Sequence, residues 1–194
     1  MKNNKTPFGA LAGMLSVLLA GGSAAAAPAA NTAAWNLVER DPPRLELVMQ
    51  LVVTCTDPES PGGSATSKDG KRTEIWPIIG GRFEGKGIRG TVIAGGGDFP
   101  VTRPDGVEVV DALYRLRTDD GVTIIIHNRG LGYPDNTDAH WHYRLSPEFT
   151  APTGKYEWLN NQLFIANLVD VPDAMRVAKG PKENDRLIQV YRVL

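Results

Sequence analysis

Glycine divides the chain from Ile79 to Gly130 at short intervals. The glycine-containing segments are Gly80-Gly81, Gly95-Gly96-Gly97, Asp105-Gly106, Asp120-Gly121 and Asn128-Arg129-Gly130. Glycine adopts backbone conformations that other residues avoid, and Asp-Gly is a common hairpin turn. This spacing is typical of short antiparallel strands joined by tight turns, and it predicts a single all-β barrel or sandwich. We interpret Gly95-Gly96-Gly97 as a turn, because no Lys-Ser or Lys-Thr pair follows it as in a phosphate-binding loop.

The N-terminal segment has the pattern of a secretory signal peptide. Lys2 and Lys5 precede an apolar run over residues 8–20, and small residues of the A-x-A type follow at 24–27. The apolar run is shorter than the about 20 residues that a membrane-spanning helix needs. We therefore expect a cleaved leader and an exported, periplasmic or secreted protein, with no stable membrane insertion after leader cleavage.

These features divide the chain into three parts. Residues 1–29 form the expected signal peptide, with cleavage near residues 26–29. Residues 30–43 form a flexible N-terminal segment, and residues 44–194 form the β-barrel domain. The length of that domain is sufficient for one hydrophobic core.

Charge and cysteine content exclude two classes of protein. The chain has 21 basic and 22 acidic residues, and removal of Lys2 and Lys5 with the leader leaves 19 basic residues. This balance has no basic patch of the kind that binds nucleic acid, so we expect no nucleic-acid partner. Cys55 is the only cysteine, so no intramolecular disulfide can form. It lies on the apolar side of an alternating segment over residues 45–55, which predicts a small buried side chain.

The hydrophobic pattern around Asp120-Gly121 predicts the register of a hairpin. A three-residue loop that pairs Thr118 with Val122 separates apolar from charged residues better than a two-residue loop does. The residues on the apolar face are then Ala112, Tyr114, Leu116, Val122, Ile124, Ile126 and Asn128. On the other face Asp111 lies opposite Arg129, and we expect a cross-strand ion pair between them.

Five residues are candidates for a site. Tyr114 and Asn128 place a phenol and an amide in an aliphatic interior, where they bond either to each other or to a ligand. Asp98 is either a turn cap or a carboxylate at the barrel mouth that acts as a general acid or base. Trp158 and Asn160 stand where the chain re-enters the sheet, and they either plug a barrel end or orient a ligand.

A metal site is not expected. His140-Trp141-His142 has the H-x-H pattern of cupins, but Glu148 is one residue too distant for that motif. No later histidine supplies the remaining ligand. No motif for another cofactor is present, so we expect neither a metal nor a cofactor.

A series of matches over about residues 45–194 resembles the domain-of-unknown-function family 3237. The matching residues are Gly80-Gly81-Arg82-Phe83-Glu84-Gly85, Arg89-Gly90, Gly95-Gly96 with Asp98, Arg103-Pro104-Asp105-Gly106, Asp111-Ala112 with Tyr114, Arg117-Thr118-Asp119-Asp120-Gly121, Asn128-Arg129-Gly130, Tyr156 with Trp158-Leu159-Asn160, and Val190-Tyr191. Phe99 replaces a usual tryptophan, and Thr150 stands where an acid is common. The resemblance implies a compact antiparallel, lipocalin-like barrel, and it implies little about function.

Three functions agree with these residues. The first is an exported barrel that binds a small, largely apolar molecule in its interior, lined by Tyr114, Asn128 and Trp158, with Asp98 and Asn160 at the mouth. The alternative is a cofactor-independent lyase, isomerase or cyclase acting on a carbonyl or aromatic compound in the same cavity. Asp98 then moves a proton while Tyr114 and Asn128 stabilise an oxyanion. A structural or interaction protein with a filled barrel is the third.

Overall fold

The computed structural model describes residues 40–62, 68–135 and 140–194. The structure discussed below lies in one compact unit, Asp41–Leu194. The expected signal peptide, 1–29, and most of the segment 30–43 lie outside the described residues. Within the described ranges, no helix has the length and hydrophobicity needed to cross a membrane.

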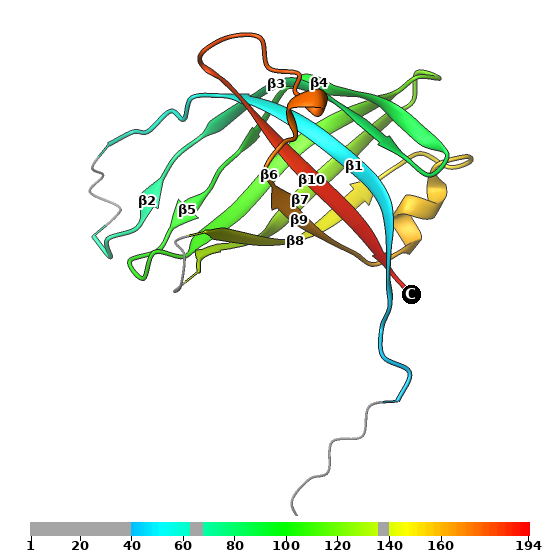
Figure 1. Ribbon diagram of the computed structural model, residues 1–194, viewed down its shortest axis with the longest axis horizontal. Helices are drawn as coiled ribbons and strands as arrows, with labels where there is room; N and C mark the ends of the chain where they lie inside the picture. Colours follow the sequence, from blue (N-terminus) through cyan, green and yellow to red (C-terminus); the bar gives the residue numbers. More distant parts are fainter. Residues whose placement is uncertain (1–39, 63–67, 136–139) are drawn as a thin grey trace, which may run out of the picture. The chain divides into compact units, whose positions relative to one another are not determined.

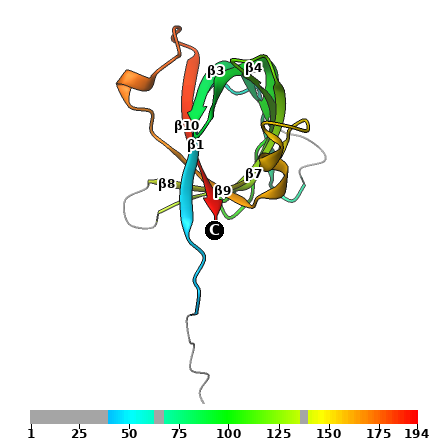
Figure 2. The same ribbon diagram turned by 90° about the vertical axis from the view of Figure 1, so that its right-hand side faces the viewer.

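Eight long strands form the wall of a closed barrel. They are β1 (Leu45–Thr56), β3 (Trp76–Gly85), β4 (Ile88–Asp98), β6 (Glu108–Thr118), β7 (Thr123–Pro134), β8 (Trp141–Thr150), β9 (Phe164–Val169) and β10 (Glu183–Val193). Each long strand pairs antiparallel with the next one along the chain, and β10 returns to pair with β1. The end-on view in Figure 2 shows the resulting ring. The predicted all-β antiparallel barrel is therefore confirmed.

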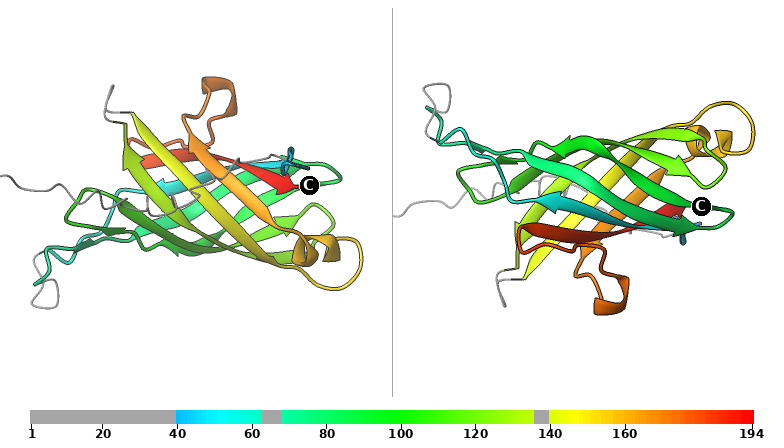
Figure 3. Two further views of the ribbon diagram at one scale, coloured as in Figure 1. Left: turned by 90° about the horizontal axis from the view of Figure 1, so that it is seen from below. Right: turned by 90° about the horizontal axis from the view of Figure 1, so that it is seen from above.

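The two ends of the barrel carry different connections. β2 (Arg72–Thr73) and β5 (Val101–Thr102) pair with each other at one end, called the β5 end here (left in Figure 1). The short 3-10 helix η1 (Glu157–Asn161) lies at the other, the η1 end, with the β3–β4 and β6–β7 hairpins. The β9–β10 connection contains η2 (Asp173–Met175) and projects from the wall, as both views of Figure 3 show.

Alternating side chains from all eight strands fill much of the interior. Leu51, Leu116, Ile124, Ile126 and Val190 are fully shielded from solvent. Burial of an aliphatic side chain of this size contributes about 1.5–3 kcal/mol relative to exposure. A smaller cluster of Val52, Val171 and Leu187 packs on the outer face, below the β9–β10 connection. The barrel interior is thus the main hydrophobic core.

The register predicted for the β6–β7 hairpin is confirmed. Ala112 pairs with Asn128 and Tyr114 with Ile126. The Thr118 amide donates to the Val122 oxygen at 2.9 Å, and Gly121 has φ +87°. Positive φ is the conformation that this three-residue loop requires and that glycine adopts without strain.

The ion pair expected between Asp111 and Arg129 is wrong. The two residues are cross-strand partners, but Asp111 contacts His127 Nε2, and Arg129 Nη2 lies 2.8 Å from Glu148 Oε1. β8 supplies a second acid next to Arg129, while His127 reaches Asp111 along the diagonal. Diagonal neighbours on one face of a sheet lie within reach of long side chains.

Two glycine runs lie inside strands, so the turn predicted at Gly95-Gly96-Gly97 is wrong. Gly80-Gly81 belongs to β3 and Gly95-Gly96-Gly97 to β4, and the strand register shifts at both places. Such bulges add twist and let a sheet curve into a barrel. A Cβ atom added to Gly96 would lie 2.5 Å from Tyr114 Cβ and 2.7 Å from the Leu113 oxygen. Glycine at this bulge therefore lets β4 pack directly against Tyr114.

The contact at Gly96 gives a stability prediction. We expect Gly96→Ala to lower the free energy of unfolding by about 1–3 kcal/mol, because the new methyl group overpacks the wall beside Tyr114. Urea denaturation measures the change. Gly180→Ala is the control, since its nearest neighbour would lie at 3.4 Å and we expect a change below about 0.5 kcal/mol. Equal stability of the two variants would contradict the packing argument.

Candidate functional site

Five strands bring a group of polar and aromatic side chains together at the β5 end. Trp76 begins β3 and pairs with Asp98 at the end of β4. Glu108 begins β6, Tyr143 lies on β8, and Arg186 lies on β10. Asp98, Glu108, Tyr143 and Arg186 affect one another electrostatically, and Arg186 stacks on Trp76. We call these five residues the polar cluster.

The carboxyl group of Asp98 titrates close to neutrality. Burial raises its pKa from 3.8 to about 6, and the Asp111 carboxylate adds to that rise. Hydrogen bonds from the Asp111 and Phe99 amides, the first of them 3.1 Å long, oppose the rise. A carboxyl group of this kind exchanges a proton near neutral pH, as general acids and bases do.

Glu108 and Tyr143 interact across a glycine. In the sheet Gly132 pairs with Glu108 on one side and with Tyr143 on the other. Because Gly132 has no side chain, the Tyr143 ring lies directly over it and its phenol reaches Glu108. Burial is the main cause of the raised pKa of Glu108, and it raises the pKa of Tyr143 to about 12. Tyr143 is therefore neutral at ordinary pH.

Arg186 brings a cation to the polar cluster without a carboxylate partner. Its neighbour Leu187 faces the outer cluster and Ile188 faces the core, so alternation places Arg186 on the inner face. The guanidinium carbon lies 4.9 Å from the centroid of the Trp76 ring, a cation-π distance. Nη1 donates to the Asp185 backbone oxygen at 3.3 Å. Within the described ranges, no Asp or Glu lies within ion-pair distance of this guanidinium.

Tyr114 and Asn128 lie deeper in the barrel with unpaired polar atoms. Tyr114 is 2% exposed and Asn128 is 1% exposed. The Tyr114 hydroxyl and Asn128 Oδ1 have no hydrogen-bond partner in the described part of the chain. Burial is the main cause that raises the pKa of Tyr114, and the nearby Asn128 amide lowers it slightly, although the two groups do not meet hydrogen-bond geometry. Neither of the two atoms is therefore satisfied by a residue that the structure describes.

Cys55 lies near Tyr114 and confirms the prediction of a buried thiol. It is 4% exposed, and burial raises its pKa to about 11. A thiol with this pKa is protonated at neutral pH and is a poor nucleophile. It contributes apolar volume to the interior.

Trp158 and Asn160 lie at the η1 end, away from the polar cluster. The Asn160 side chain accepts from the Ala151 amide and donates to the Ala151 oxygen, both at 2.8 Å. The Trp158 ring packs edge-on against Phe164 with centroids 6.0 Å apart. The structure thus brings Tyr114 and Asn128 together, and it places Asp98 and Asn160 at opposite ends.

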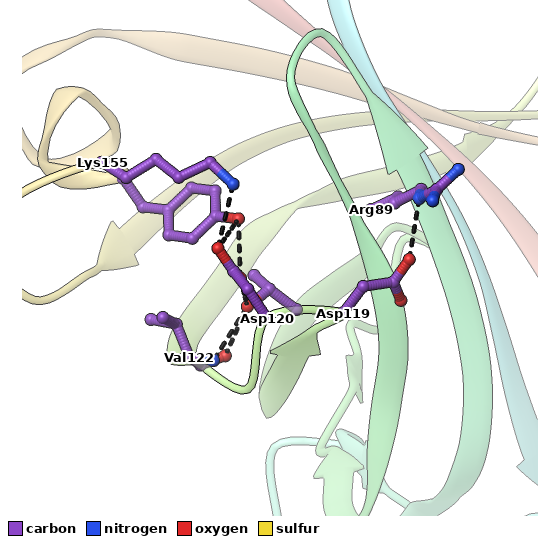
Figure 4. A network of polar contacts seen from close by, with 7 residues as sticks. Arg89, Asp119, Asp120, Val122 and Lys155 are labelled. Atoms are coloured by element: carbon purple, nitrogen blue, oxygen red, sulfur yellow. Dashed lines mark hydrogen bonds and ion pairs between the residues drawn. The ribbon is translucent and has the colours of Figure 1, made fainter.

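A network around Asp120 holds η1 against the barrel end (Figure 4). Asp120 accepts from the Tyr156 hydroxyl at 2.8 Å, from Lys155 Nζ at 2.9 Å and from the Thr118 hydroxyl. These hydrogen bonds, that of Thr118 first, hold the pKa of Asp120 well below its usual value. Beside it, Arg89 pairs with Asp119 at 2.7 Å. The contacts join the β6–β7 hairpin to the segment that carries η1.

The sequence analysis missed Trp76, Glu108, Tyr143 and Arg186. Alternation alone places Tyr143 toward the core, but only the closure of β10 onto β1 brings Arg186 near Asp98.

For the metal prediction, the described ranges contain no group of three or more potential metal ligands, and His142 contacts Asp135 at 3.1 Å.

The raised pKa of Asp98 predicts a pH dependence of stability. The folded-state pKa of about 6 exceeds the ordinary value of 3.8, so the folded state binds more protons between these values. Stability therefore falls, by on the order of 2 kcal/mol, as the pH rises from about 4 to about 6. Asp98→Asn removes this fall and raises stability at neutral pH, as urea denaturation at several pH values measures.

Asp119→Asn is the control for that variant, since it breaks only an exposed ion pair. We expect it to change stability by less than about 1 kcal/mol. A fall between these pH values that is as large in Asp98→Asn as in the wild type would contradict the assignment to Asp98.

Comparison with known proteins gives the family of the chain. A family model described as "Protein of unknown function (DUF3237)" matches residues 43–193. A UPF0311 protein of Clostridium acetobutylicum is 32% identical over 114 residues, which cover 53% of this chain and 72% of that protein. A UPF0311 protein of Rhodopseudomonas palustris is 31% identical over 106 residues, covering 48% of this chain and 69% of that protein.

Solved structures agree with this assignment. A conserved protein of unknown function from Rhodopseudomonas palustris has a TM-score of 0.64 at 25% identity, covering 80% of this chain and 100% of that one. A β-barrel-like protein from Acinetobacter baumannii has a TM-score of 0.66 at 22% identity, with coverage of 81% and 100%. An enzyme from Penicillium herquei has a TM-score of 0.57 at 21% identity, with coverage of 82% and 100%. The last two show the fold alone. With the family model, these likenesses show that the chain belongs to the DUF3237/UPF0311 family of small β-barrel proteins of unknown function.

Proposed function

We propose that the protein binds a small, largely apolar molecule inside the barrel, entering from the β5 end. The observation that carries this proposal is the pair of buried, unpaired atoms, the Tyr114 hydroxyl and Asn128 Oδ1. An unsatisfied buried polar group costs about 1–3 kcal/mol. A ligand hydroxyl group accepts from Tyr114 and donates to Asn128 Oδ1, which satisfies both atoms.

The surroundings of these atoms support a ligand that is mostly apolar. Tyr114 and Asn128 lie within a continuous hydrophobic core. Trp76, Tyr143 and Leu168 are partly buried and pack against that core. Ligand pockets are typically apolar with a few converging polar groups. The β5 end supplies such groups in the polar cluster, whereas the polar side chains around Asp120 at the η1 end bond to one another.

Export of the protein remains part of this proposal. Native mass spectrometry of the protein from its own host, compared with the denatured mass, tests both export and ligand binding. The denatured mass identifies the N-terminus, and we expect it to lack the residues up to 26–29. Additional mass under native conditions alone identifies the bound molecule.

Substitution of Tyr114 separates ligand binding from a structural role. Tyr114→Phe removes an unpaired hydroxyl, so we expect the stability of the empty protein to stay within about 1 kcal/mol of wild type. We expect the affinity for the molecule found by mass spectrometry to fall roughly tenfold, as calorimetric titration measures, because one hydrogen bond is lost.

Tyr156→Phe provides the matched control, since it removes a hydroxyl that donates to Asp120 at the η1 end. We expect it to lower stability by about 1.5–3 kcal/mol and to leave affinity unchanged. A buried water molecule between Tyr114 and Asn128 is the competing explanation. Lower stability of Tyr114→Phe together with unchanged affinity would support the water and contradict the ligand.

An enzyme is the second candidate function, and Asp98 favours it. Its pKa of about 6 suits proton transfer near neutral pH. In this version Asp98 moves a proton of a carbonyl or aromatic compound, and Tyr114 and Asn128 stabilise the developing oxyanion, giving lyase, isomerase or cyclase chemistry. Asp98→Asn then abolishes turnover and leaves ligand binding nearly intact. Equal loss of both would favour binding alone.

A further inference from the structure

We infer that the bound molecule carries a carboxylate group and that Arg186 binds it at the barrel mouth. This inference rests on the proposed function and adds the chemical class of the ligand. It places an organic acid with its carboxylate at the β5 end and its apolar part along the core, with a hydroxyl group at the far end of that part between Tyr114 and Asn128. The apolar part then contacts Trp76 and the core residues beside it.

The guanidinium of Arg186 has unused donors in a suitable position. It is planar and carries five N–H donors, which match a carboxylate in a two-point contact. Only the backbone oxygen of Asp185, at 3.3 Å, accepts a hydrogen bond from it within the described ranges. The contact with the Trp76 ring holds the group in place, and its other N–H donors have no acceptor within the described ranges. Arginine held in this way is suited to recognise an anion.

Neighbouring side chains explain why this arginine remains unpaired. Asp185, next to it in sequence, accepts instead from the Thr54 hydroxyl at 2.7 Å and from the Val177 and Ala178 amides at 2.6 and 2.9 Å. Glu108 interacts with Tyr143. Asp98 accepts from the Asp111 amide. Each carboxylate close to Arg186 therefore has another partner.

The same carboxylates make binding of an acid depend on pH. Asp98 on β4 and Glu108 on β6 face Arg186, with Glu74 before β3 and Asp111 beside Asp98. Their negative charge opposes a bound carboxylate, whereas Cys55 and Tyr143 are neutral because their pKa values are raised. Asp98 accepts a proton readily, so the complex takes one up as the acid binds. Affinity for an acid then rises by up to about tenfold for each unit of falling pH above the pKa of Asp98.

The test compares matched acids, primary alcohols and primary amines. The panel has phenylpropyl, 4-hydroxyphenylpropyl and hexyl to dodecyl skeletons, each ending in one of the three groups. Titration calorimetry measures affinity for the full mature protein at several pH values above the pKa of Asp98. We expect acids to bind more tightly than the matched alcohols and amines, and only acids to bind more tightly as the pH falls.

Variants of Arg186 assign the effect to its side chain. We expect Arg186→Gln to lower the affinity for acids by roughly 10- to 100-fold and to leave the affinity for alcohols unchanged. Arg186→Lys keeps the charge without the planar donors and should give an intermediate loss. Circular dichroism checks that each variant folds, and Arg186→Lys keeps the test valid if Arg186→Gln does not. Arg117→Gln, an exposed arginine on β6, makes the same change in net charge and should have no effect.

The outcomes separate this inference from the proposed function. One outcome is that alcohols bind as tightly as acids, and that affinity falls in Tyr114→Phe but not in Arg186→Gln. This result would overturn the inference of a carboxylate ligand and leave the binding proposal standing. Preferred binding of amines would overturn it in favour of Asp98 and Glu108 as the recognition groups. No binding across the panel at about 1 mM would overturn both.

Discussion

The pairing of β10 with β1 is the constraint on which the rest of the structure depends. It joins Leu45 to Val193 at one end and Thr56 to Glu183 at the other, and it turns an eight-stranded sheet into a ring. With the ring closed, no long strand has an unpaired edge, and one face of every strand becomes interior. It also brings Arg186, near the C-terminus, to the same end as Trp76 and Asp98. Without this pairing neither the core nor the polar cluster exists.

The side chains that fill the interior differ between the two ends of the barrel. Toward the η1 end it is filled by aromatic and aliphatic side chains, among them Phe149 and Phe164 with ring centroids 5.1 Å apart. Toward the β5 end it carries polar and charged groups, whose pKa values burial has shifted. Perturbed ionisable groups tend to mark functional sites. The contrast between the two halves is the physical basis for proposing a site at the β5 end.

Alternation along single strands accounts for what the sequence predicted well. It gave the inward positions of Tyr114 and Asn128, because a hairpin register depends only on neighbouring segments. It misread Gly95-Gly96-Gly97 as a turn, because a bulge and a turn share the same residue type. Arg186 and Glu108 were not found, since their relation to Asp98 depends on contacts between strands far apart in the chain. Patterns in a single sequence predict local geometry such as a hairpin register. Contacts between strands far apart in the chain follow only from closure of the barrel.

The Asp120 network has a consequence for how such a barrel changes. Thr118, Lys155 and Tyr156 fasten the η1 end with contacts that do not involve the polar cluster. Sites far apart in a protein contribute to stability almost independently. Under the proposed function, the contacts that hold the fold at the η1 end are thus separate from the side chains that contact a ligand at the β5 end. Substitutions at the β5 end then leave the contacts around Asp120 unchanged, so side chains at that end can diversify while the opposite end keeps its structure.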